Sequence, residues 1–252
     1  MSDYWENFPC TMGDKPAFIS YDHGISKEFE QLNHANFAGF RVSLLDSNES
    51  GFPVAEEFAK LNDVEDFLCH SFGADQGVQI GRITSNGYRY FYFYTSLDQL
   101  RSEEIASEAS KIHGHQIELI YELDLERVRY WNELYPTEDD WRVIKDMRVH
   151  ELLKEKGDSL TTPRHIDHWA YFDSCDQRDA FVNSVKSDFE QIEFGEIQNE
   201  EGIRYSVRLS HTGLPDYRSM NTITLKLARA SRQYGGDYDG WETMVCADED
   251  CG

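Results

Sequence analysis

The order of elements along the chain predicts an α+β protein built from two ferredoxin-like α/β sandwich domains. Short apolar runs and helical apolar spacing follow one another in the order β-α-β-β-α-β from Phe37 to Leu123. The same order recurs from His165 onward, after the breaker that runs from Gly157 to Pro163. In each domain we expect an antiparallel sheet with helices on one face. The two stretches share no residue-level repeat, so the expected similarity is one of architecture.

The first domain is expected over residues 1–136. Its clearest element is a hairpin over 77–95, because Asn86-Gly87 joins two strand-like runs and Asn-Gly is the strongest short hairpin signal. A helix is expected from Ala55, where Glu56 and Glu57 occupy the first turn and favour the helix dipole. The remaining elements are strands over 16–21, 37–45 and 116–123, a helix over 98–113 that stops at Gly114, and an aromatic connector over 130–136.

Residues 137–157 are expected to form a helix that connects the domains. Thr137 is a plausible N-cap with Asp140 three residues later, and Gly157 ends the helical pattern. The spacing predicts that one side of this helix carries Trp141, Ile144, Arg148 and Leu152.

The second domain is expected over residues 158–252. The pattern predicts strands over 165–172, 194–198 and 203–209 and helices over 178–190 and 217–234. Gly235-Gly236 stops the last helix, and a final strand follows. On that strand, strict alternation places Asp239, Trp241, Thr243 and Val245 on one face.

The chain is strongly acidic. Its 252 residues include 47 acidic and 24 basic side chains, which give a formal net charge of -23 at pH 7. Nucleic-acid backbones and anionic membranes repel such a chain, so we expect no direct binding to nucleic acid or membrane. Hydrophobic residues make up 40% of the sequence, which is enough for folded cores, and the charge permits a basic protein partner.

The protein is expected to be cytoplasmic. The N-terminus lacks the basic flank and apolar core of a signal peptide, and no run approaches the roughly 20 apolar residues of a membrane helix. The five cysteines are scattered without a Cys-x-x-Cys motif, which predicts neither a disulfide framework nor a zinc site.

The sequence contains no strong catalytic or metal-binding pattern. No phosphate-binding glycine loop and no nucleophile elbow occur. His165 and Asp167 would share one face of a strand, but two ligands are too few for a metal, and His168 would point away. Cys175 at a helix start and the pair Ser210-His211 are the nucleophile candidates, and pairs of this kind arise by chance among nine histidines. We therefore expect no catalytic residue, no metal, no cofactor and no enzymatic activity.

Two other groups of side chains leave alternatives open. The helix over 217–234 carries Lys226, Arg229 and Arg232 loosely on one side, either as a solvated face or as a contact for phosphate or a partner. The aromatic run over 88–94 either packs in the core or at a domain interface, or lines a ligand groove.

The final strand carries the run Asp237-Tyr238-Asp239-Gly240-Trp241-Glu242. This run, with the order of elements over roughly the last hundred residues, resembles the bacterial family named regulator of ribonuclease E activity B. The first 140 residues or so resemble a bacterial domain family of unknown function (DUF695-type). That second resemblance rests on three segments: Gly13 to Ala17, Asn86 to Tyr94, and Tyr130 to Thr137.

The first resemblance implies a non-enzymatic regulatory protein that binds ribonuclease E and reduces its activity. The residues that match the signature are Asp237, Tyr238, Asp239, Gly240 and Trp241, and they either bind a partner or close the fold. The alternative is a small-ligand-binding protein or enzyme with a site between the two domains, where His165, Asp167, Cys175 or His211 would converge. The sequence leaves the oligomeric state undetermined.

Overall fold

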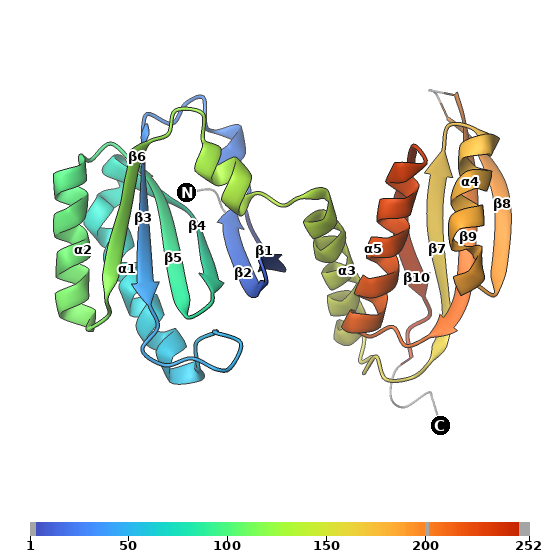
Figure 1. Cartoon of the computed structure of the whole chain (residues 1–252), viewed down its shortest axis with the longest axis horizontal. Helices are drawn as coiled ribbons and strands as arrows, with labels where there is room; N and C mark the ends of the chain where they lie inside the picture. Colours follow the sequence, from blue (N-terminus) through green and yellow to red (C-terminus); the bar gives the residue numbers. More distant parts are fainter. Residues whose placement is uncertain (1–3, 200–201, 247–252) are drawn as a thin grey trace. The chain divides into compact units, whose positions relative to one another are not determined.

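The computed structural model describes residues 4–199 and 202–246, which divide into two compact units, Met1–Pro136 and Thr137–Gly252 (Figure 1). Each unit contains one antiparallel sheet together with helices, so the fold is of the α+β class. Among the described residues, no helix is both long enough and apolar enough to span a membrane.

The first unit contains a six-stranded sheet in the order β1-β2-β4-β5-β3-β6. From β3 onward, its elements follow the predicted order β-α-β-β-α-β. The bounds are β1 Trp5–Met12, β2 Lys15–Asp22, β3 Asn36–Ser43, α1 Ala55–Gln76, β4 Gly77–Ser85, β5 Tyr88–Thr95, α2 Gln99–His113 and β6 Ile117–Leu123.

The strand β1 was not expected from the sequence. It pairs with β2 at the edge of the sheet, and it contains Pro9, a residue that is tolerated in a sheet mainly at an edge because it cannot donate a ladder hydrogen bond. The expected hairpin is present between β4 and β5, where Asn86 and Gly87 adopt φ values of 50° and 80°.

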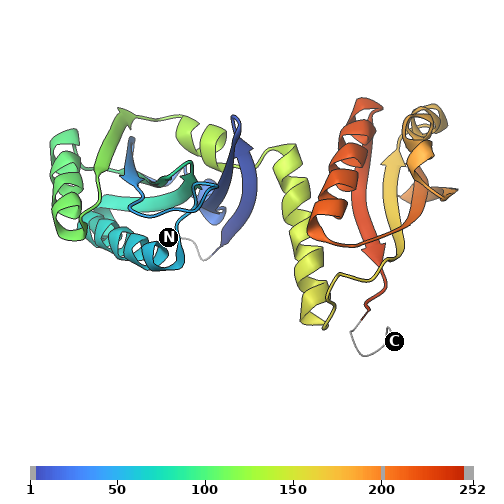
Figure 2. The same ribbon diagram turned by 60° about the horizontal axis from the view of Figure 1, so that its bottom comes forward.

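The two faces of this sheet are covered by different elements (Figure 2). On one face, α1 and α2 bury a core that includes Leu61, Leu68, Phe91 and Phe93. The other face packs against the π-helical turn Tyr130–Leu134, so most of the aromatic run over 88–94 is buried on both sides. Tyr92 and Tyr94 are among the core residues, which favours the core interpretation of this run over a ligand groove.

The second unit contains a four-stranded sheet in the order β10-β7-β9-β8. Its helices and strands are α3 Glu138–Glu155, β7 Arg164–Phe172, α4 Cys175–Val185, β8 Gln191–Asn199, β9 Gly202–Gly213, α5 Tyr217–Gln233 and β10 Gly236–Thr243. Phe181 from α4 and Leu227 from α5 pack with Phe172 and Val207 from the sheet, so both helices cover the same face.

The helix α3 packs within the second unit, mainly against α5. Its N-terminus has the expected capping box between Thr137 and Asp140. Of the residues expected on one side of this helix, Ile144 is buried, whereas Leu152 is 51% exposed and Arg148 is also exposed. The buried side chains instead include the polar residues Arg142, Asp146 and His150, whose partners lie on other elements.

Candidate functional site

The signature strand β10 contains a β-bulge. Tyr238 pairs with Ala170 and Gly240 pairs with Trp169, so Asp239 is the extra residue of the strand. The bulge places the side chains of Tyr238 and Trp241 on the same face of the sheet. Their cross-strand neighbours on that face are the buried side chains of Ala170 and His168. The predicted sharing of one face by Asp239, Trp241, Thr243 and Val245 is therefore wrong for Asp239, and Val245 lies beyond the end of the strand.

Trp241 lies in a buried polar network with α3 and α5. Its Nε1 donates a hydrogen bond of 2.9 Å to Oδ1 of Asp146, and the hydroxyl of Thr224 donates one of 2.5 Å to Oδ2. Nη2 of Arg142 is 2.8 Å from the same Oδ1. Asp146 is completely buried, so a single carboxylate joins α3, α5 and β10.

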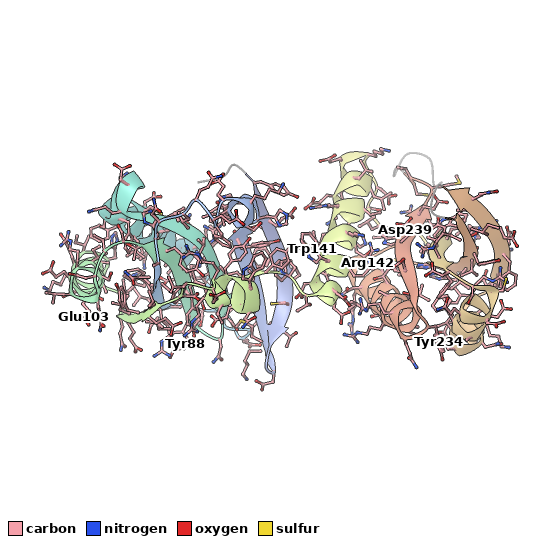
Figure 3. The ribbon with its side chains drawn as sticks, turned by 90° about the horizontal axis from the view of Figure 1, so that it is seen from above. Tyr88, Glu103, Trp141, Arg142, Tyr234 and Asp239 are labelled. Carbon is pink, nitrogen blue, oxygen red and sulfur yellow. The ribbon has the colours of Figure 1, made fainter. Side chains whose placement is uncertain are left out.

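Burial raises the pKa of the Asp146 carboxyl above its ordinary value, while Arg142, Thr224 and Trp241 all favour the charged form. Arg142 also donates from Nη1 to the main-chain oxygen of Asp239, over 3.0 Å, and its guanidinium lies 5.3 Å from the ring centroid of Tyr238. Figure 3 shows Arg142 and Asp239 beside each other. The bulged residue is thus fixed by an arginine of α3.

Tyr238 begins a second chain of buried polar groups. Its hydroxyl is 2.7 Å from Nδ1 of His168, and Nε2 of His168 is 3.0 Å from Nε2 of His211. Two neutral imidazoles can form this chain, since each ring has one N–H and one bare nitrogen. Burial lowers the pKa of His168 to about 3, with smaller contributions from His211 and Arg142. The chain lies under the helices, where it holds β10, β7 and β9 together.

The two aspartates of the signature are exposed, in contrast to Trp241. Asp237 lies 2.8 Å from Nη2 of Arg204 on β9, and its side chain remains 75% exposed. The structure therefore separates the signature into residues that hold the strand, Tyr238 and Trp241, and acidic side chains that face solvent, Asp237 and Asp239.

Asp237 belongs to the sheet face opposite α4 and α5, which we call the open face. The register of the strands assigns to it Asp167, Trp169, Tyr171, Glu193, Ile197, Arg204, Ser206, Arg208, Ser210, Asp237 and Glu242. Trp169 donates from Nε1 to Glu242 over 3.3 Å, and the guanidinium of Arg208 lies 5.6 Å from its ring centroid. Arg208 also lies 2.6 Å from Glu193. This face offers half-buried aromatic rings between ionic groups.

The nucleophile and metal candidates do not converge in the described residues. His165 and Asp167 share a face and lie 3.0 Å apart, as expected, and Asp167 accepts a hydrogen bond from Ser210. His211 points to the opposite face, so Ser210 and His211 do not form a pair. Cys175 lies at the first position of α4 near Tyr205. In residues 4–199 and 202–246, no three His, Cys, Asp or Glu side chains are arranged to hold a metal ion.

Two further groups of residues have defined positions. Arg229 and Arg232 on α5 form ion pairs with Asp139 at the start of α3, and Lys226 pairs with Asp188. These cations therefore contact neighbouring parts of the second unit. Cys246 is disulfide-bonded, which the scattered spacing of the cysteines did not predict, while Cys69 and Cys175 are free thiols.

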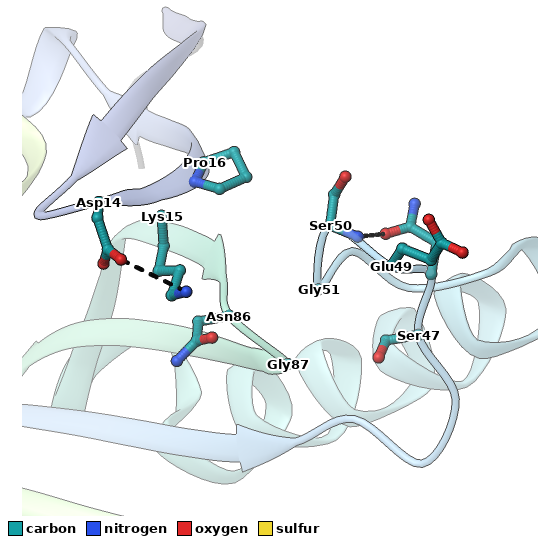
Figure 4. Close-up of a pocket in the computed structure, with 10 residues that line it drawn as sticks. Asp14, Lys15, Pro16, Ser47, Glu49, Ser50, Gly51, Asn86 and Gly87 are labelled. Carbon is teal, nitrogen blue, oxygen red and sulfur yellow. Dashed lines mark hydrogen bonds and ion pairs between the residues drawn. The ribbon is translucent and has the colours of Figure 1, made fainter.

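The first unit has a polar hollow at one end of its sheet (Figure 4). It measures about 500 Å³ and is lined by the turn before β2, the loop after β3 and the turn between β4 and β5. Lys15 contributes a cation that lies 3.5 Å from Asp14. The hollow contains no histidine or cysteine, so its lining offers hydrogen bonding without an evident nucleophile.

Sequence reasoning missed the polar residues of α3 and α5 that support the signature. Arg142, Asp146 and His150 follow one another at a spacing of four residues, which indicates one helix face but does not distinguish a solvated face from a buried one. Thr224 on α5 has no local signal for burial. The reason for a carboxylate at position 146 is visible only in the structure, where Asp146 accepts the hydrogen bond from Trp241.

Comparisons with known proteins give two family matches, in separate parts of the chain. Residues 3–135 match the model described as "Family of unknown function (DUF695)", and residues 144–243 match the model described as "Regulator of ribonuclease activity B". Both resemblances drawn from the sequence are thereby confirmed. The second match includes all of α4, α5 and the four-stranded sheet.

No curated protein matches the chain. Among solved structures, a crystal structure of an unknown protein from Galdieria sulphuraria has 11% sequence identity, and the alignment covers 84% of this chain and 99% of that one. Its TM-score is 0.24, so it supports no argument about fold or function.

Proposed function

We propose that this chain, which belongs to the family of unknown function DUF695 through residues 3–135, is a non-enzymatic protein that modulates ribonuclease E through its C-terminal domain. The observation that carries the proposal is the match of residues 144–243 to a regulator of ribonuclease activity. In this proposal the chain acts in the cytoplasm, its partner is another protein, and no cofactor takes part.

The charge and the geometry support a protein partner. A net charge of -23 opposes direct binding to RNA and favours encounter with a basic surface. The exposed carboxylates Asp237 and Asp239 supply negative charge at the signature, while Tyr238 and Trp241 keep the strand in place.

We also propose that the two compact units are two domains, 1–136 and 137–252, with α3 as part of the second. Each is of the ferredoxin-like type. The sheet order β10-β7-β9-β8 supports this, because it places the first and third strands of the β-α-β-β-α-β unit at the centre. The order β4-β5-β3-β6 supports the same for the first domain, where the β1–β2 hairpin extends the sheet.

The proposal is tested with purified full-length chain and purified ribonuclease E. We expect the immobilised chain to retain the ribonuclease and to slow its cleavage of a fluorogenic RNA, more strongly at low salt than at high salt. The double variant Asp237→Asn with Asp239→Asn is expected to weaken retention several-fold, because it removes two exposed charges without changing side-chain size.

The matched control is Glu108→Gln with Glu151→Gln, which removes two exposed charges from α2 and α3 and is expected to leave retention unchanged. If ribonuclease E is neither retained nor slowed by the wild-type chain, the proposed function is wrong.

A further inference from the structure

The strand β8 forms an unpaired edge of the second sheet (Figure 1). It is nine residues long and pairs with β9 in continuous register, without a bulge or a proline. Within the described residues, no strand pairs with its other side. A long, regular edge presents unpaired main-chain N–H and C=O groups to any chain that can add a strand.

The opposite edge of the same sheet is protected. There, β10 has the bulge at Asp239, and Arg142 of α3 occupies the main-chain oxygen of that residue. Bulges and covering elements are devices that prevent strand addition. The contrast indicates that β8 is the edge of this sheet that is available to a partner.

Large apolar side chains are exposed along β8 and at the start of β9. Phe194 is 55% exposed on the helix-covered side, where the guanidinium of Arg178 lies 4.4 Å from its ring centroid. Ile197 is 44% exposed on the open face, and Ile203 at the start of β9 is 48% exposed. An added strand would cover such side chains on both faces of the sheet.

The charge of this edge indicates what kind of strand can be added. Glu193 lies on the open face, where it is ion-paired with Arg208 and remains 58% exposed, and Glu196 lies exposed on the helix-covered side. A second copy of the chain would bring two more glutamates to the shared edge and would add the repulsion of two chains of charge -23. A segment with lysine or arginine side chains on both faces is complementary.

We propose that β8 is a docking edge, which takes an extended basic segment of a protein partner as a fifth strand of the second sheet. Main-chain hydrogen bonds from the unpaired side of β8 supply binding energy, and the alternating side chains of the segment supply specificity. Each face of β8 offers one glutamate and one large apolar side chain, so the segment needs a basic and an apolar residue on each of its faces. This inference rests on the proposed function, since it takes a protein as the partner.

The probe for the test is a fluorescein-labelled ten-residue peptide that repeats lysine-lysine-valine-valine, which places both residue types on each face of a strand. Fluorescence anisotropy with the full-length chain is expected to show saturable binding. Hydrogen exchange is expected to show slower exchange of β8 amides in the complex. The same peptide with N-methyl groups at alternate residues keeps its charge but loses main-chain donors, and we expect it to bind roughly tenfold more weakly.

The variant for the test is Glu193→Lys with Glu196→Lys, which reverses the charge of the edge at two exposed positions. We expect its affinity for the peptide to fall by roughly tenfold or more. The control Glu108→Lys with Glu151→Lys makes the same change in net charge on exposed helix positions, and its affinity is expected to stay within about twofold of wild type.

The outcomes separate this inference from the proposed function. Absence of peptide binding, equal binding of the N-methylated peptide, or unchanged exchange of β8 amides would each overturn the docking edge. Protection of β8 in a dimer without peptide would also overturn it, in favour of a second copy. If ribonuclease E is retained while the peptide results fail, the docking edge is wrong and the proposed function stands.

Discussion

At the scale of single residues, Asp146 explains why the signature contains a tryptophan. A buried carboxylate is costly unless charged and hydrogen-bonding groups surround it. Arg142, Thr224 and Trp241 supply those groups from three elements. The indole N–H thus has a role beside that of the apolar ring, because a phenylalanine at 241 would fill space without donating to the carboxylate.

The buried histidine His168 predicts a loss of stability in mild acid. Its pKa is lowered to about 3 in the folded chain by burial, followed by His211 and Arg142. In the unfolded chain this histidine takes up a proton below its ordinary pKa of 6.5. The contribution of the neutral, buried ring to the free energy of unfolding is therefore fully present above that pH, and it decreases as the pH falls toward 3. The slope is at most about 1.4 kcal/mol per pH unit for this residue. His211 and His150 act in the same direction, because burial lowers the pKa of each.

Denaturant unfolding at pH 7 and pH 5 measures this slope. His168→Gln keeps a partner for the hydroxyl of Tyr238 but cannot be protonated, so we expect a smaller difference between the two pH values. The control His165→Gln changes a histidine whose side chain is 54% exposed, and we expect the wild-type difference. An unchanged difference in His168→Gln would show that this ring does not govern the acid response. Asp146 opposes the trend, because its raised pKa favours the folded state at lower pH.

At the scale of elements, Arg142 joins α3 to β10. Arg142→Ala removes the cation beside the buried Asp146 and the donor to the bulge, and leaving a buried charge unpaired costs about 3–5 kcal/mol. We expect the amides of α3, α5 and β10 to exchange faster, by the factor that corresponds to this loss of free energy of unfolding. Native-state hydrogen exchange measures it.

The matched control for this prediction is Lys145→Ala, which removes an exposed cation three residues later on α3 and is expected to change exchange very little. Exchange in Arg142→Ala that equals the control would contradict the assigned role of the arginine.

Elements with local chemical signals were predictable from the sequence. The hairpin at Asn86-Gly87, the capping box of Thr137 and Asp140, and the stop of α2 at Gly114 are all present. Each depends on a few neighbouring residues whose conformational preferences agree with the fold.

Elements without such signals were not predictable. The strand β1 lacks a regular apolar alternation and contains Pro9, which argues against a strand unless the edge position is known. The bulge at Asp239 has no sequence signal, and it changes which residues of the candidate site share a face. The buried side of α3 consists partly of charged residues, and their burial depends on partners more than 70 residues away.

At the scale of the whole molecule, the two compact units have separate hydrophobic cores, so we expect them to unfold separately. Phe93→Ala in the first core removes a ring that is 1% exposed, at a cost of about 3–5 kcal/mol. Hydrogen exchange should accelerate in β3, β5 and α1 and stay unchanged in β7, β9 and α5.

Phe181→Ala is the reciprocal variant, because that ring is completely buried in the second core. It should accelerate exchange in the second unit alone. Accelerated exchange in both units from either variant would show that they unfold as one cooperative structure, against the proposed division into domains.

The contrast between the two edges of the second sheet also bears on stoichiometry. A sheet that accepts strands on both sides can join chains end to end without limit, as fibres do. Here the bulge and Arg142 close the β10 side, while β8 remains open. One free side allows a single segment to pair directly with the strands of this chain. Because the β10 side is closed by the geometry of the signature, the chain cannot link two partners through both edges of this sheet, and we expect one partner segment per chain.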